Sequence, residues 1–153
     1  MIYVECKPDF ALIKSFGIPK KNIIHAKNKS EVCKKLKKNG NSKGLVDEDP
    51  YSPQPSYMKK LEIKEDLPDH KLKLLIDRSN DSSLIIVCPT LEAWILKATK
   101  EAKTDIKKYG LPNNAEKLHK IINIRIDKFK KLIEDLKEKS KMVKTLEKLL
   151  KGR

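Results

Sequence analysis

The first fifty residues alternate between short apolar runs and longer amphipathic segments. The apolar runs at residues 2–4, 22–25 and 44–46 are typical of buried strands. The segments that follow Pro8 and Asn28 place apolar side chains at helical spacing, and Asn28 with Glu31 resembles a capping box. Both strand-to-strand connections are long enough for right-handed crossovers, so the pattern predicts parallel strands in an α/β fold.

The second half of the chain predicts more strands and then helices. Three prolines within residues 50–55 exclude a helix or a central strand there. Residues 73–77 and 83–88 read as strands, a helix follows Pro89, and apolar stripes at 118–136 and 142–150 indicate amphipathic helices. We therefore predict a three-layer, Rossmann-like, mostly parallel sheet at residues 1–112. A helical extension at 113–153 packs on the same domain.

Composition narrows the class of protein. A chain of 153 residues with 39% hydrophobic residues is about the size of one domain with its own core. Its apolar runs are too short for a membrane-spanning helix, and its first residues lack the pattern of a signal peptide. Cys6, Cys33 and Cys88 are an odd number without a CxxC pair, which disfavours a disulfide framework or a thiolate zinc site. We expect a cytoplasmic protein.

Charge is unevenly distributed along the chain. The net charge is +14, and 32 of the 35 basic residues are lysine. Residues 1–45 carry +8 and residues 113–153 carry +7, whereas residues 46–112 carry −1. Such a field attracts polyanions, so nucleic acid is a candidate partner. The lysines that we expect to contribute most to this attraction are Lys7, Lys27, Lys29, Lys34 and Lys35.

Acidic residues follow two of the predicted strands. Glu5 ends the first strand, whereas Asp47 and Asp49 lie at and just beyond the end of the third. In a parallel sheet these ends share one edge, where open α/β folds bind their ligands. Residues two apart in an extended chain project to the same side, so Asp47 and Asp49 can share one ion. A hard divalent cation, Mg²⁺ or Mn²⁺, would relieve the repulsion among these carboxylates.

A strand-terminal glutamate followed by a strand ending in Asp47-Glu48-Asp49 resembles the TOPRIM fold. This Mg²⁺-binding domain is shared by topoisomerases, bacterial primases, the 5S ribosomal RNA maturase and OLD-family nucleases. Residues 91–94 are also similar to a Glu-Ala-Trp stretch of small TOPRIM-like proteins, and the resemblance spans about residues 1–100. It implies that Glu5 is the general acid/base and that Asp47 and Asp49 bind the metal. Glu48 and Glu92 are candidates for a second ion.

One position departs from that pattern. The family usually has glycine directly after the glutamate, and this chain has Cys6. Asp9 and Glu92 also have a simpler interpretation, because acidic residues in the first turn of a helix stabilise its N-terminus.

These features lead to a functional hypothesis with two alternatives. The first is a Mg²⁺-dependent phosphotransferase that acts on DNA or RNA, most simply a small nuclease. The second is a non-catalytic module that binds nucleic acid or a metal-nucleotide in a defence or repair assembly. In a third, the C-terminal helices form an interaction surface, for example in a homodimer. The proline-rich loop begins at Asp49 and is a candidate substrate-binding loop through Tyr51, Gln54, Ser56 and Tyr57.

Overall fold

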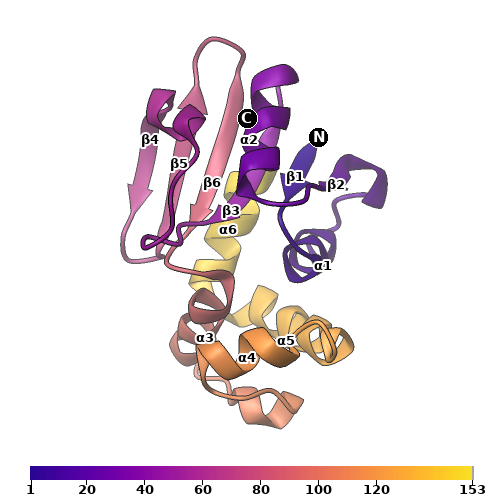
Figure 1. Cartoon of the computed structure of the whole chain (residues 1–153). Helices are drawn as coiled ribbons and strands as arrows, with labels where there is room; N and C mark the ends of the chain where they lie inside the picture. The colour runs from indigo at the N-terminus through magenta and orange to yellow at the C-terminus, as the bar shows by residue number, and fades with distance from the viewer. Residues whose placement is uncertain (153) are drawn as a thin grey trace.

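Six strands form one sheet in the computed structural model, which describes residues 1–152 (Figure 1). Their order across the sheet is β2-β1-β3-β6-β5-β4. The neighbouring strands β2, β1, β3 and β6 are parallel, whereas β5 is antiparallel to β6 and β4 is antiparallel to β5. The strands are β1 (Ile2–Val4), β2 (Ile23–His25), β3 (Lys43–Asp47), β4 (Glu62–Leu67), β5 (Leu72–Asp77) and β6 (Ser82–Val87).

The predicted α/β class with a mostly parallel sheet is confirmed, and the five predicted strands are present with ends shifted by a residue at most. The sequence analysis did not predict β4. This edge strand carries mainly charged residues and is exposed over Glu62–Asp66, so it lacks the apolar face by which strands are recognised.

The helices begin where the sequence offers a capping residue. Asn28 Oδ1 accepts a hydrogen bond from the Glu31 N–H at 2.9 Å and starts α2, and Thr90 caps α3 in the same way. Asn114 caps α4 by accepting a hydrogen bond from the Lys117 N–H at 3.0 Å. The helices are α1 (Lys7–Ser15), α2 (Lys29–Lys38), α3 (Leu91–Glu101), α4 (Ala115–Ile121), α5 (Ile126–Lys139) and α6 (Lys141–Lys151), with 3₁₀ turns η1 (Lys20–Asn22), η2 (Ser56–Lys60) and η3 (Ile106–Tyr109).

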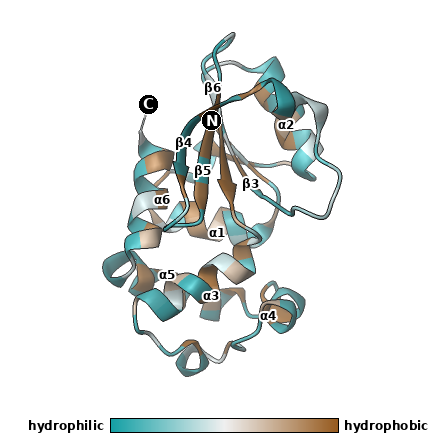
Figure 2. Cartoon of the chain, turned by 90° about the vertical axis from the view of Figure 1, so that its left-hand side faces the viewer, coloured by the Kyte–Doolittle hydropathy of each residue, from teal (hydrophilic) through white to brown (hydrophobic). Residues whose placement is uncertain are grey.

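Helices cover both faces of the sheet. One face packs against α2, and the approach is so close at Gly44 that a Cβ there would lie 2.7 Å from a Val32 methyl group. The other face packs against α1, α3, α5 and α6, whose apolar side chains join a single large core. Figure 1 shows α3, α4 and α5 below the end at which the parallel strands terminate. The brown strands in Figure 2 lie between helices whose outer faces are hydrophilic.

The C-terminal helices bury their apolar residues within this chain. The predicted stripe at 118–136 is divided by a turn at 122–125 into α4 and α5. Its side chains at Leu118, Phe129 and Ile133 are fully buried in the shared core. These side chains of the stripe therefore pack within the chain and do not form the exposed surface considered from the sequence for a homodimer. No helix within residues 1–152 combines the length and apolar character needed to cross a lipid bilayer.

Candidate functional site

The carboxyl ends of β1, β3 and β6 meet at one edge of the sheet. Glu5 directly follows β1, and its Oε2 accepts a hydrogen bond from the backbone N–H of Asp47 at 2.9 Å. The next N–H, that of Glu48, donates to the Val87 carbonyl at the end of β6 at 2.8 Å. The parallel arrangement thus brings Glu5 and Asp47 together at one rim, as expected from the sequence.

Asp47 also contacts the start of α3. Its Oδ1 accepts a hydrogen bond at 3.1 Å from the backbone N–H of Leu91, one of the first N–H groups of the helix, which have no partner within it. Burial, followed by the charge of Glu5, raises the pKa of Asp47 to about 7 despite this hydrogen bond. Burial also raises the pKa of Glu5, although the Asp47 N–H favours its charged form. Perturbed carboxyl groups at a sheet edge are candidates for function.

Asp9 is the most deeply buried acid of this rim. It lies in the first turn of α1 and is 1% exposed, and neither carboxyl oxygen has a hydrogen-bond partner. Burial, then the charge of Asp47, raises its pKa well above the usual range, although the neighbouring Cys6 thiol favours its charged form. Burial and the Asp9 charge raise the pKa of the Cys6 thiol, which is therefore a poor nucleophile here. Sequence reasoning gave Asp9 only the role of complementing the helix.

Glu92 lies in the first turn of α3, and its charge is among those that raise the pKa values of Glu5, Asp9 and Asp47. Its Oε1 lies 2.8 Å from Nδ1 of His119 on α4. His119 was not among the residues predicted for the site. No sequence signal indicated this contact, which joins residues 27 positions apart.

Asp49 was expected to project to the same side as Asp47, but the backbone between them is not extended. The prediction assumed an extended chain from Asp47 to Asp49, but β3 ends at Asp47 and Asp49 has a left-handed backbone with φ of 46°. Its N–H donates to the Pro89 carbonyl at 2.8 Å, and its Oδ2 accepts a hydrogen bond from Ser52 Oγ at 2.9 Å. Its charge still contributes to the raised pKa of Glu5. Asp49 is therefore an exposed residue at the rim of the site.

The proline-rich loop after Asp49 is held by side-chain hydrogen bonds. Lys29 Nζ donates to the Glu48 carbonyl and to Gln54 Oε1, both at 2.9 Å. Gln54 Nε2 donates to three loop carbonyls, those of Glu48, Asp49 and Ser52, at 3.0–3.1 Å. The same loop leaves the ring of Tyr51 fully exposed. These two predicted loop residues therefore differ: Gln54 holds the loop backbone, and Tyr51 is exposed to solvent.

The other two predicted loop residues lie away from this rim. Tyr57 Oη donates to Asp77 Oδ2 at 2.6 Å, and Asp77 pairs with Ser82, the first residue of β6. The Tyr57 hydroxyl is therefore bound at the sheet edge opposite to Glu5. Ser56 is exposed at the start of η2. The prediction that Tyr57 contacts a substrate at the acidic rim is therefore wrong. The loop turns back along the sheet before it reaches this residue.

Glu48 is separated from the acids that it was expected to join. Its carboxylate lies 3.5 Å from Lys73 Nζ on β5. Glu48 follows the end of β3 and pairs with Lys73 on β5, whereas Asp47 contacts the start of α3. Glu48 is therefore a poor candidate for a second metal ligand beside Glu5.

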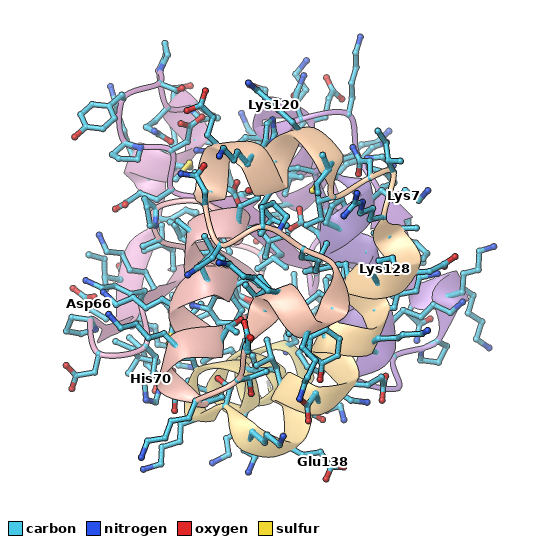
Figure 3. All side chains as sticks on the ribbon, turned by 90° about the horizontal axis from the view of Figure 1, so that it is seen from below. Lys7, Asp66, His70, Lys120, Lys128 and Glu138 are labelled. Carbon is cyan, nitrogen blue, oxygen red and sulfur yellow. The ribbon has the colours of Figure 1, made fainter. Side chains whose placement is uncertain are left out.

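The predicted nucleic-acid-binding lysines surround the site unevenly. Lys7 and Lys27 are exposed close after β1 and β2, whereas Lys29 is half-buried and bonded to the loop. Lys34 pairs with Glu31 at 3.2 Å, and Lys35 is exposed on α2. Viewed from below, Lys7 and Lys128 lie toward the right of the molecule and Asp66 and His70 toward the left, with Lys120 at the top between them (Figure 3).

The acids approach one another without forming a ready metal site. Among residues 1–152, no three His, Cys, Asp or Glu side chains are already arranged to hold a metal ion. The charges of these acids nevertheless act on one another, because Glu5, Asp47 and Glu92 each contribute to the raised pKa of a neighbouring acid. No family model, curated protein or solved structure matches this chain.

Proposed function

We propose that this chain is a TOPRIM-like, Mg²⁺- or Mn²⁺-dependent phosphotransferase that acts on nucleic acid, most simply a small nuclease. The observation that carries the proposal is the group formed by Glu5, Asp9, Asp47 and Glu92 at the carboxyl edge of the parallel strands. Open α/β sheets bind their ligands at this edge. The strand-terminal Glu5 and the Asp47-Glu48-Asp49 sequence supply the resemblance to TOPRIM domains at the same place.

The residues at this rim suit a hard cation. Two carboxyl oxygens of Asp9 are buried without a hydrogen-bond partner, and such groups are costly unless something satisfies them. The rim offers carboxylate oxygens, which Mg²⁺ and Mn²⁺ prefer, while the one nearby thiol has a raised pKa. Glu5 and Asp47 keep their positions through bonds to backbone N–H groups, so a cation would meet a partly organised set of oxygens.

Glu5, Asp47 and Glu92 have proposed functions in the hydrolysis of a phosphodiester. Asp47 would hold the ion, with Asp49 at the rim and Glu92 as a further ligand. When bound, the ion supplies charge stabilisation at a phosphoryl oxygen. Glu5 accepts a proton from the attacking water, the phosphorus–oxygen ester bond breaks, and the leaving oxygen takes a proton from solvent.

The basic residues around the acidic rim support a polyanionic substrate. The net charge of +14 persists although this edge collects several acids. Lys7 and Lys27 are exposed on the segments after β1 and β2, next to the rim. Such lysines attract phosphates without reading the sequence of bases, so binding would weaken steeply with salt.

Cleavage assays test this proposal. Single-stranded and duplex DNA and RNA oligonucleotides are incubated with Mn²⁺ and the wild type, Glu5→Gln, or the double variant Asp47→Asn with Asp49→Asn. We expect cleavage by the wild type and a loss of at least about 100-fold in each variant, since proton transfer alone contributes about that much. Glu65→Gln, which removes an exposed acid from β4, is the matched control and should retain activity. A folded double variant that cuts as fast as the wild type would refute the assignment.

A second candidate is a non-catalytic module that binds a metal-nucleotide or nucleic acid. Cys6 favours it, because this side chain stands directly after Glu5 and against Asp9, where TOPRIM enzymes usually have glycine. Thermal melting with Mn²⁺ distinguishes the candidates when combined with the cleavage assay. A raised melting temperature, which follows from binding to the native state, without cleavage of any of the four substrates would favour the module.

A further inference from the structure

Glu92 is the acid of the rim whose position depends on another part of the chain. It is 8% exposed, and in residues 1–152 its carboxylate has one hydrogen-bond partner, His119. Its other oxygen, Oε2, is left for a further ligand. A carboxylate near other carboxylates is repelled by them, so it needs a donor to keep it at the rim.

The backbone of α4, which carries His119, is anchored in the core, although the imidazole ring is largely exposed. His119 lies on α4 next to Leu118, which is fully buried, and Ile122 at the end of the helix is 1% exposed. Asn114 caps the helix by accepting a hydrogen bond from the Lys117 N–H at 3.0 Å. The imidazole therefore gains little from burial, with a side chain 76% exposed, and its specific contact is the one to Glu92.

The contact joins Nδ1 of His119 to Oε1 of Glu92. In the tautomer that carries its proton on Nδ1, the imidazole donates this hydrogen bond, since a carboxylate oxygen can only accept. The charge of Glu92 in turn acts on Glu5, Asp9 and Asp47. An imidazole from α4, outside the region that resembles TOPRIM domains, is thereby coupled to the acids of the rim.

We propose that His119 is a positioning residue of the site: its Nδ1–H orients the Glu92 carboxylate toward a bound divalent cation, so that α4 is part of the site. The inference rests on the proposed function, because it assigns a purpose to Glu92 in cation binding. Groups that orient metal-binding side chains through hydrogen bonds typically change metal affinity by roughly 10- to 100-fold when removed.

Mn²⁺ affinity, measured by the electron paramagnetic resonance signal of the free ion, tests the proposal without turnover. His119→Ala removes the donor, and His119→Asn retains a side-chain N–H near the position of Nδ1. We expect affinity to fall roughly 10- to 100-fold in His119→Ala and to recover most of that loss in His119→Asn. Lys120→Ala, at the next position of α4, is the matched control and should leave the affinity unchanged. Circular dichroism and thermal melting establish that each variant is folded.

The outcomes separate this inference from the proposed function. If the wild type binds Mn²⁺ and folded His119→Ala binds it equally well, His119 has no positioning role and the proposed function stands. If His119→Asn loses as much affinity as His119→Ala, the hydrogen bond is not the cause and the inference fails. A wild type that binds no Mn²⁺ overturns both. Mn²⁺ binding without cleavage leaves the inference in place and favours the non-catalytic module.

Discussion

Replacing Asp47 by Asn should stabilise the metal-free protein relative to the wild type by an amount that increases with pH. The quantity to compare is the difference in unfolding free energy between the two proteins at acidic and at alkaline pH. The pKa of Asp47 rises from 3.8 to about 7 in the fold, first because of burial and then because of Glu5. The native state therefore holds this proton more tightly than the unfolded chain does. As a result, the wild type loses stability as the pH rises from about 4 to about 7. Asn has no charge to lose and retains an oxygen that can accept the Leu91 N–H.

The size of the effect follows from the shift. One pKa unit corresponds to about 1.4 kcal/mol, so a shift of about three units gives a penalty on the order of 4 kcal/mol once both states are ionised. Between about pH 5 and pH 8 the part that develops is about 2 to 3 kcal/mol, because the unfolded chain is already largely ionised at pH 5. The difference in unfolding free energy, Asp47→Asn minus wild type, should increase by that amount.

Urea denaturation at about pH 5 and pH 8 in the presence of a chelator measures this difference. Subtracting the unfolding free energy of the wild type at each pH removes the contribution of groups that both proteins share. Asp77 and Asp135, whose pKa values are lowered, are two such groups. Asp66→Asn, an exposed acid of β4, is the control and should show no such trend. Equal pH dependence of Asp47→Asn and wild type would show that Asp47 is not ionised at a cost, which would remove the physical basis of the cation site.

Three further predictions concern the rim, the loop and the C-terminal helices. Asp9→Asn should fold, and the rise in melting temperature that Mn²⁺ gives the wild type should be smaller; an undiminished rise would separate Asp9 from the cation. Tyr51→Ala should weaken single-stranded oligonucleotide binding by about tenfold in fluorescence anisotropy with chelator present, since stacking on a base is worth about 1–3 kcal/mol. Tyr51→Phe should not. Ser140→Ala should lower the unfolding free energy in urea by about 1–2 kcal/mol, because Ser140 Oγ accepts the Val143 N–H at 3.2 Å and donates to Glu101 at 2.7 Å; an unchanged midpoint would contradict this role.

The parts of the fold that the sequence predicted are those with a clear apolar period. Residues 2–4, 44–46 and 83–88 are continuous apolar runs because their strands are covered on both faces, as parallel strands usually are. The edge strand β4 gave no such signal, because its residues from Glu62 to Asp66 are exposed. The break between α4 and α5 was also missed, since the apolar stripe continues through the turn at 122–125 while the backbone does not.

The site was predictable only as far as strand topology determines it. Parallel strands end at one edge, so Glu5 and Asp47 share that edge, and the pairing of β1 with β3 brings them together. The direction of Asp49 depends on a left-handed backbone at φ of 46°, and the contact of Glu92 depends on how α4 packs on α3. Neither follows from local propensity, because both are set by tertiary contacts between segments distant in sequence.

The acids of the rim differ from other hydrogen-bonded acids of this chain in the direction of their pKa shifts. One oxygen of Glu5, Asp47 and Glu92 lies against a fixed donor: the Asp47 N–H, the Leu91 N–H and His119, respectively. Glu101 and Asp77 also accept hydrogen bonds, but their pKa values are lowered, whereas burial raises the pKa values of Glu5 and Asp47. Donors hold Glu5 and Asp47 in place, while burial and the neighbouring charges make their ionisation costly. Under the proposed function, a divalent cation that binds the native state would offset this cost.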